Sequence, residues 1–194
     1  MAKFSLPQNF SAHFLQIFLS FTLIRPPFTV FDYLCTMIVA FSGHRSYVEN
    51  QNSKLEQTIE RLYNEGYTIF MSGMADGFDL AAAEAVLQLK RRLPDIKLHC
   101  IIPFKGHIYT LSRRAQARYK VVREAADVVI ELAERRDERS YFVRNDYLID
   151  KADALLCYYS GKRSGTGYTV KKAIKKCIKI VNLYADGTQI LFFG

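Results

Sequence analysis

The stretch YTIFMSGMADGFDLAAAE, residues 67–84, decides the fold of this chain. It opens with a short apolar run, 67–71, whose length and β-branched and aromatic content predict a strand buried on both faces. A loop containing Gly73 and Gly77 follows, and then an alanine-rich segment whose apolar residues recur at helical spacing until Pro94. A strand, a glycine loop and a helix in this order predict one unit of a parallel sheet.

The same alternation runs from Met37 to near the end of the chain. Further short apolar runs predict strands at 38–41, 98–102, 128–132, 154–158 and 178–183. Between them, residues with helical spacing predict helices around 55–62, 111–125, 140–151 and 168–177. Repeated strand–helix–strand units predict an α/β fold with a mostly parallel sheet and right-handed crossovers.

The composition is that of an ordinary globular protein. With 194 residues, of which 49% are hydrophobic and 24% charged, the chain suits a single domain. No stretch reaches the roughly 18 apolar residues that cross a bilayer. The cysteines at 35, 100, 157 and 177 are scattered and no histidines cluster near them, so we expect neither a disulfide framework nor a metal site. These features predict a cytoplasmic protein without membrane contact.

The net charge of +8 has two interpretations. Basic runs such as Lys90–Arg92 and Lys171–Lys176 are typical of solvated helix faces. They would equally attract a polyanion, either a phosphorylated small molecule or nucleic acid. Charge alone does not choose between the two.

Residues 1–36 differ from the rest of the chain. They are rich in phenylalanine, and their charged residues are only Lys3, Arg25 and Asp32. Our hypothesis is that Met37 is the natural start and that the preceding segment is upstream sequence. The alternative is a genuine extension that packs on the domain. The expected domain is therefore 37–194.

Two loops at strand ends are candidate ligand-binding elements, because ligands of parallel α/β folds lie beyond the carboxyl ends of the strands. The first carries Gly43, His44 and Arg45, which suit a close backbone approach and recognition of phosphate or carboxylate. An ordinary turn explains it as well. The second contains Ser72, Gly73, Gly77 and Asp79 and runs directly into a helix, whose N-terminus favours an anion.

Asp79 and Glu84 in this second segment each have a structural alternative to a functional role. Asp79 could instead cap the helix that begins here. Glu84 could be an ordinary exposed helical residue.

A third loop, Ser160–Gly167, holds three glycines, two hydroxyl side chains and two cations, which favour a phosphate cradle. Gly165, Thr166 and Gly167 are its candidate contacts, and Thr166 can also cap the following helix. Arg144 and Asn145 lie near the start of another helix. They could reach a ligand over the sheet edge, or form an intrahelical pair.

Together these motifs resemble the YpsA/YoqJ-like family of the SLOG superfamily, which also contains the DprA proteins and the LOG phosphoribohydrolases. The resemblance spans about 37–183. It implies a Rossmann-like three-layer sandwich whose cleft binds a nucleotide or a nucleotide-derived ligand such as ADP-ribose. The phosphoribohydrolases carry a Pro-Gly-Gly-x-Gly-Thr-x-x-Glu motif. Here the comparable stretch is 163–169, without the Pro-Gly-Gly element and without the carboxylate.

Three functions remain open at this point. The first is sensing or regulation through a bound nucleotide-like molecule, with no cofactor. The second is hydrolysis of a nucleotide N-glycosidic bond, with Glu84 or Asp79 as the catalytic carboxylate. The third is binding of single-stranded DNA. A homo-oligomer is compatible with each of them.

Overall fold

The computed structural model describes residues 36–47, 51–184 and 189–191. Contacts divide the chain into two units, Met1–Cys35 and Thr36–Gly194, and the second holds all the described residues. The hypothesis about the first 36 residues therefore concerns a segment that, apart from Thr36, lies outside the described part of the chain.

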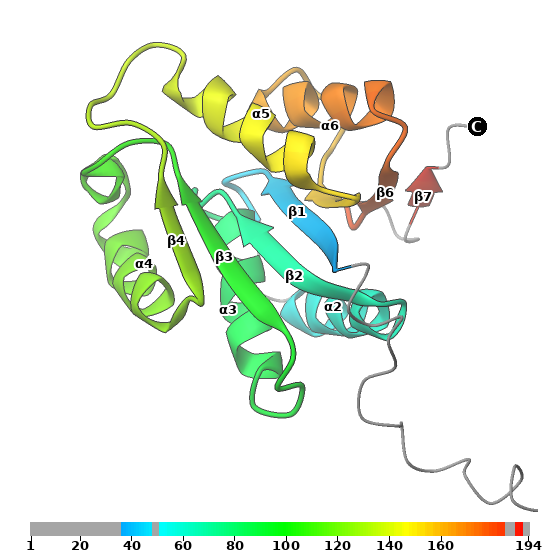
Figure 1. The fold of residues 1–194 in the computed structure, drawn as a ribbon. Coiled ribbons are helices and arrows are strands. Elements are labelled where there is room, and N and C mark those ends of the chain that lie inside the picture. Colours follow the sequence, from blue (N-terminus) through cyan, green and yellow to red (C-terminus); the bar gives the residue numbers. More distant parts are fainter. Residues whose placement is uncertain (1–35, 48–50, 185–188, 192–194) are drawn as a thin grey trace, which may run out of the picture. The chain divides into compact units, whose positions relative to one another are not determined.

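A single sheet organises the second unit (Figure 1). The strands, in the spatial order β4–β3–β2–β1–β5–β6–β7, are β4 (Val128–Glu131), β3 (Lys97–Ile102), β2 (Tyr67–Ser72), β1 (Met37–Gly43), β5 (Ala154–Tyr158), β6 (Lys179–Asn182) and β7 (Gln189–Leu191). The first six run parallel, and β7 pairs antiparallel with β6. The predicted, mostly parallel α/β fold is confirmed, and β7 is a strand that the sequence did not predict.

Helices cover both faces of this sheet and make the three-layer sandwich (Figure 1). One face carries α2 (Asn52–Asn64), α3 (Phe78–Leu89) and α4 (Arg113–Ala125), and the other carries α5 (Ser140–Lys151) and α6 (Gly165–Lys175). A short 3₁₀ turn, η2 (His107–Thr110), precedes α4.

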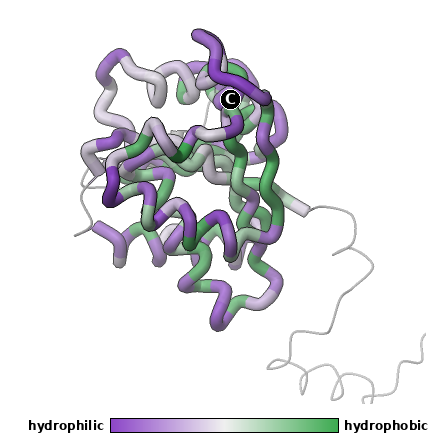
Figure 2. The backbone as a smooth tube through the Cα atoms, turned by 90° about the vertical axis from the view of Figure 1, so that its left-hand side faces the viewer, coloured by the Kyte–Doolittle hydropathy of each residue, from purple (hydrophilic) through white to green (hydrophobic). Residues whose placement is uncertain are grey.

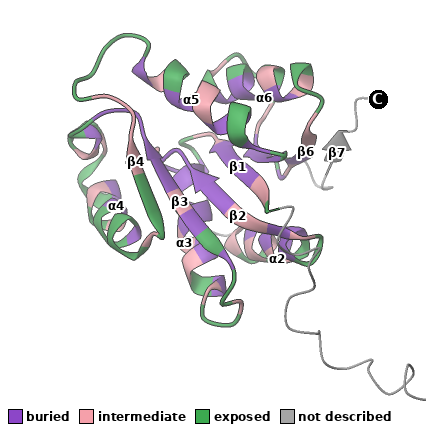
Figure 3. Ribbon diagram, in the orientation of Figure 1, coloured by how far each residue is buried: buried purple, intermediate pink, exposed green. Residues whose placement is uncertain are grey.

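Alternation along the strands explains the two cores. In β1, Val39 and Phe41 pack with α2 and α3, whereas Ala40 between them packs with α5 and α6. All three are fully buried. The central strands β1, β2 and β5 are therefore mostly buried on both faces, as continuous apolar runs predict, whereas the edge strand β4 is partly exposed (Figure 3). Hydrophilic residues are concentrated on the helices and loops (Figure 2).

Two helix starts differ from the predictions. Gly77, with φ +81°, occupies the cap position of α3, so the predicted capping role of Asp79 is wrong. Ser164 rather than Thr166 caps α6, and its hydroxyl accepts a hydrogen bond from the Gly167 N–H at 3.1 Å. In both cases the capping residue lies two positions earlier, which leaves the predicted side chain inside the first turn.

Within the described ranges, no helix is long and apolar enough to span a membrane.

Candidate functional site

A cavity of about 300 Å³ lies at the carboxyl ends of β1, β2 and β5. Its lining comes from the first, second and third predicted loops and from α5: Ser42, Gly43, His44, Arg45, Ala75, Asp79, Tyr141, Arg144, Asn145, Ser164, Gly165 and Thr166. Eight of the predicted site residues are in this lining, drawn from four segments far apart in the sequence. Parallel strands bring these loops to one edge of the sheet, which is why the segments meet there.

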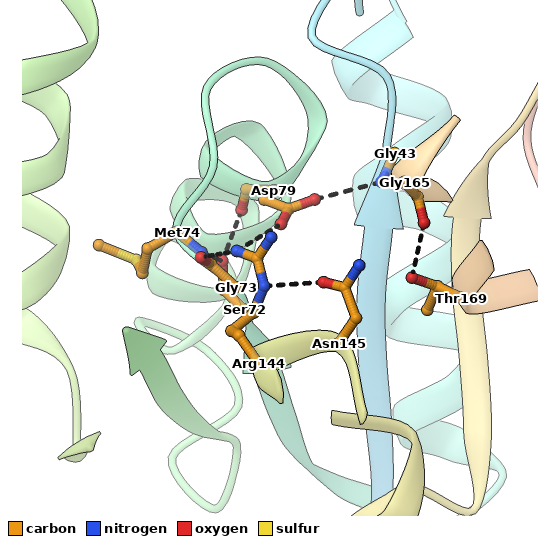
Figure 4. Close-up of polar contacts among 9 residues, drawn as sticks. All are labelled: Gly43, Ser72, Gly73, Met74, Asp79, Arg144, Asn145, Gly165 and Thr169. Atoms are coloured by element: carbon orange, nitrogen blue, oxygen red, sulfur yellow. Dashed lines mark hydrogen bonds and ion pairs between the residues drawn. The ribbon is translucent and has the colours of Figure 1, made fainter. Parts of the chain in front are cut away.

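Asp79 lies in the first turn of α3 and is 4% exposed. Its Oδ1 accepts a hydrogen bond from the Gly43 N–H at 3.2 Å, which ties the end of β1 to α3 (Figure 4). Its main-chain carbonyl accepts from the Ser72 hydroxyl at 2.9 Å. The second loop and the first are thus joined through one buried carboxylate.

Arg144 reaches the same place from α5 and is 7% exposed. Its Nη1 lies 4.0 Å from Asp79 Oδ2 and also donates to the Gly73 carbonyl. Its Nε donates to Asn145 Oδ1 at 2.8 Å (Figure 4). A fixed, buried guanidinium therefore stands beside a fixed, buried carboxylate, each within the cavity lining.

Burial dominates the electrostatics of this pair. Loss of water raises the pKa of Asp79 to about 6, although the Arg144 charge and the Gly43 N–H both act to lower it. Burial also lowers the pKa of Arg144, which the Asp79 charge raises again. Asp79 is consequently a carboxyl group that changes protonation close to neutral pH, which ordinary aspartates do not.

His44 forms another part of the wall. Its Nε2 accepts the Ser160 N–H at 2.9 Å and lies 3.0 Å from the Ser160 hydroxyl. Burial, and then the Lys162 charge, lower the pKa of His44. A backbone N–H can only donate, so the neutral ring carries its proton on Nδ1.

The third loop contributes the N-terminus of α6. Ser164, Gly165 and Thr166 line the cavity there, and Thr166 is 6% exposed. A side chain added at Gly165 would meet no atom within 4 Å, so the backbone at this position faces free space. The unpaired N–H groups and the dipole of a helix start favour an anion at this end of the cavity.

The remaining predicted residues of these loops shape the site without lining the cavity. A Cβ at Gly73 would lie 2.5 Å from Arg144 Nη1, and one at Gly77 would lie 2.5 Å from the Arg45 carbonyl oxygen. A Cβ at Gly167 would lie 3.0 Å from the Tyr159 hydroxyl. Ser72, besides its bond to Asp79, accepts the Met74 N–H at 3.1 Å. These positions allow close packing of the loops around the cavity.

Glu84, the second catalytic candidate, lies outside the lining. Its carboxylate binds the Arg118 guanidinium through two hydrogen bonds of 2.7 and 2.6 Å, which join α3 to α4. Asp79 and Glu84 therefore do not form a pair of carboxylates facing one cavity.

Four lining residues were not among the predicted site residues: Ser42, Ala75, Tyr141 and Ser164. A signal for Tyr141 existed. It precedes Arg144 by three positions in one helix, which places both on the same helix face. Ala75 offered no such signal, because the sequence pattern around an alanine that lines a cavity is the same as that around an alanine in a core.

Two lysines of the basic run Lys171–Lys176 bind groups within the protein. Lys172 forms ion pairs with Asp146 at 2.7 Å and Asp150 at 3.2 Å. Lys176 Nζ donates to three main-chain carbonyls around the end of α5. These contacts favour the structural interpretation for this run. Among the described residues, no group of three or more His, Cys, Asp or Glu side chains is arranged to hold a metal ion.

Fold and cavity define the class: a Rossmann-like α/β domain with a polar cavity at the carboxyl edge of its parallel strands. The family follows from the sequence match. A family model described as the YspA SLOG family (YpsA) matches residues 30–190, and the chain belongs to this family.

The chain is also similar to curated relatives and to solved structures. The UPF0398 protein of Halalkalibacterium halodurans is 29% identical over 150 residues, covering 76% of this chain and 79% of that protein. The DprA structure from Streptococcus pneumoniae aligns with a TM-score of 0.55 and 19% identity over 75% of this chain and 50% of its own. The Helicobacter pylori DprA structure, described for its single-stranded DNA binding mode, aligns with a TM-score of 0.57 and 18% identity. The alignment covers 79% of this chain and 68% of that chain. At identities below 20%, these alignments show a shared fold and nothing more about this chain.

Proposed function

We propose that the cavity binds a nucleotide-derived ligand such as ADP-ribose and that the protein acts as a sensor or regulator through it. One observation carries the proposal: the N-terminus of α6 lines the same cavity as Arg45 and Arg144. All three attract the oxygens of a phosphate group. Asp79 and Asn145 in the same lining supply acceptors and donors suited to sugar hydroxyls.

Charge supports the same ligand class. Two arginines face one aspartate, so the cavity stays cationic even with Asp79 ionised. Burial strengthens the attraction between such a site and an anion, because the local dielectric is lower than that of water.

Isothermal titration against ADP-ribose, NAD and nucleoside phosphates tests the proposal. Thr166→Val keeps the shape of a buried lining residue but removes its hydroxyl, and it should weaken binding. Thr169→Val is the matched control, since this hydroxyl, one turn later, donates to the Gly165 carbonyl at 3.1 Å and lies outside the lining. Arg144→Ala should also weaken binding, with circular dichroism to verify the fold. Absence of heat with every ligand, and no molecule carried through purification, would contradict the proposal.

A second candidate function is nucleotide N-glycosidic hydrolysis, which the raised pKa of Asp79 favours. A carboxyl group that titrates near neutral pH in a cavity is suited to general acid or base chemistry. The Glu84 carboxylate is engaged by Arg118, so Asp79 is the better candidate. Free base released from nucleoside monophosphates by wild type and Glu84→Gln, but not by Asp79→Asn, would support catalysis. No release by wild type would exclude it for these substrates.

A further inference from the structure

A second cavity, of about 280 Å³, opens beside the first. It is lined by Arg136, Asp137, Glu138 and Tyr141, from the loop between β4 and α5 and the first turn of α5. Tyr141 is the residue that both cavities share. The two spaces therefore adjoin at this side chain, and we name them the inner cavity, at the strand ends, and the outer cavity, at Arg136–Tyr141.

The Tyr141 ring is held by two buried aromatic neighbours. Its centroid lies 5.9 Å from that of Phe104 and 5.9 Å from that of His107, with interplanar angles of 75° and 67°. Phe104 is 3% exposed and His107 is 2% exposed, so both are fixed in the protein. Such edge-to-face contacts orient a ring before any ligand arrives.

Two guanidinium groups accompany this ring. The Cζ of Arg144 lies 5.9 Å from the ring centroid and that of Arg136 lies 5.8 Å from it. Arg144 is buried in the inner cavity, whereas Arg136 is exposed in the outer one. Asp137 is committed to the loop itself, since its Oδ1 accepts the Arg139 N–H at 2.6 Å. The outer cavity thus combines an oriented aromatic ring with an exposed planar cation.

We propose that the outer cavity is a nucleobase subsite, in which the base stacks on Tyr141 and against Arg136. The inference rests on the proposed function, because it places the phosphorylated part of the same ligand in the inner cavity. A nucleotide joins an anionic group to an aromatic ring, and the adjoining cavities offer the matching pair of environments. Aromatic rings and guanidinium planes both stack on bases of any sequence.

Binding of AMP and of ribose 5-phosphate, which lacks the base, tests the proposal. Wild type should bind AMP about tenfold tighter than ribose 5-phosphate, the gain typical of one base stacking on an aromatic side chain. Tyr141→Leu keeps an apolar side chain against Phe104 and His107 but removes the stacking ring. It should weaken AMP about tenfold more than it weakens ribose 5-phosphate, and the retained binding of ribose 5-phosphate shows that the variant is folded. Arg136→Ala should weaken AMP alone, whereas Arg135→Ala, at an exposed neighbour outside both linings, should change neither.

The outcomes separate this inference from the proposed function. Equal affinity for the two ligands, or equal weakening of both by Tyr141→Leu, would overturn the nucleobase subsite, while weaker ribose 5-phosphate binding in Thr166→Val would preserve the proposed function. Binding of neither ligand would overturn the nucleobase subsite, and a lack of binding to ADP-ribose and NAD as well would overturn the proposed function. A thymidine octanucleotide tests single-stranded nucleic acid as the source of the base. Displacement of AMP by this octanucleotide, with weaker octanucleotide binding in Tyr141→Leu, would support the subsite with that source.

Discussion

Replacing Asp79 by asparagine should stabilise the folded protein at neutral pH, although it removes a charge from the candidate site. Burial holds the pKa of this carboxyl at about 6, against an ordinary value of 3.8, after the Arg144 charge and the Gly43 N–H have lowered it. One pKa unit corresponds to ~1.36 kcal/mol, so ionised Asp79 costs the fold about 3 kcal/mol. An asparagine oxygen can still accept the Gly43 N–H, and its uncharged amide stands in for protonated Asp79. The Arg144 charge lacks a counter-charge beside either group, so the pKa of Asp79 already includes that loss.

The sign of the pH dependence follows from proton binding. Between about pH 4 and pH 6 the folded protein keeps a proton on Asp79 that the unfolded chain has lost, so this group makes stability fall as pH rises. The Asp79→Asn variant lacks this contribution. Its advantage over wild type should be near zero below about pH 4, grow up to about pH 6, and then stay constant.

Urea denaturation of both proteins across this range measures the difference. Asp127→Asn is the matched control with the opposite sign. Burial raises the pKa of Asp127, but the hydrogen bonds from Lys90 and the Leu98 N–H outweigh it and the pKa is lowered. Its carboxylate therefore stabilises the fold above the unfolded pKa, a contribution lost as pH falls, and its removal should destabilise at neutral pH. A loss of stability in Asp79→Asn at neutral pH, or a difference from wild type that does not vary with pH, would refute the reasoning.

Four further outcomes are expected. Gly43→Ala should cost about 1–3 kcal/mol in a denaturation experiment, because the new Cβ would lie 2.4 Å from the Phe78 Cβ. Gly165→Ala meets no atom within 4 Å, so it should leave the thermal midpoint intact while lowering ligand affinity in titration calorimetry. Glu84→Gln weakens only the partly exposed pair with Arg118, so it should change stability by at most about 1 kcal/mol and leave ligand affinity unchanged. Burial lowers the pKa of His107 from 6.5 to about 4, so between these pH values the unfolded chain binds a proton at His107 that the folded protein does not. Wild type therefore loses stability over this range as pH falls, and acid denaturation of His107→Phe should show a smaller loss.

Local pattern was sufficient for most of the fold. Apolar runs of strand length alternating with helical spacing gave the six parallel strands and the helices between them. The short strand β7 belongs to an apolar run, 190–193, that the sequence interpretation did not count as a strand. It pairs antiparallel with β6, whereas the alternation of strands and helices predicts parallel strands only.

The site divides in the same way. Glycine loops at strand ends pointed to Gly43, Asp79 and Thr166, which line the cavity because parallel strands deliver their carboxyl ends to one edge. The sequence by itself thus determined where a ligand would be sought and which loops would form the wall. Only the tertiary structure decided the pairings between distant elements. It joined Glu84 to Arg118 and placed Tyr141 between two cavities, since side-chain partners depend on how helices rotate and pack, which no local pattern encodes.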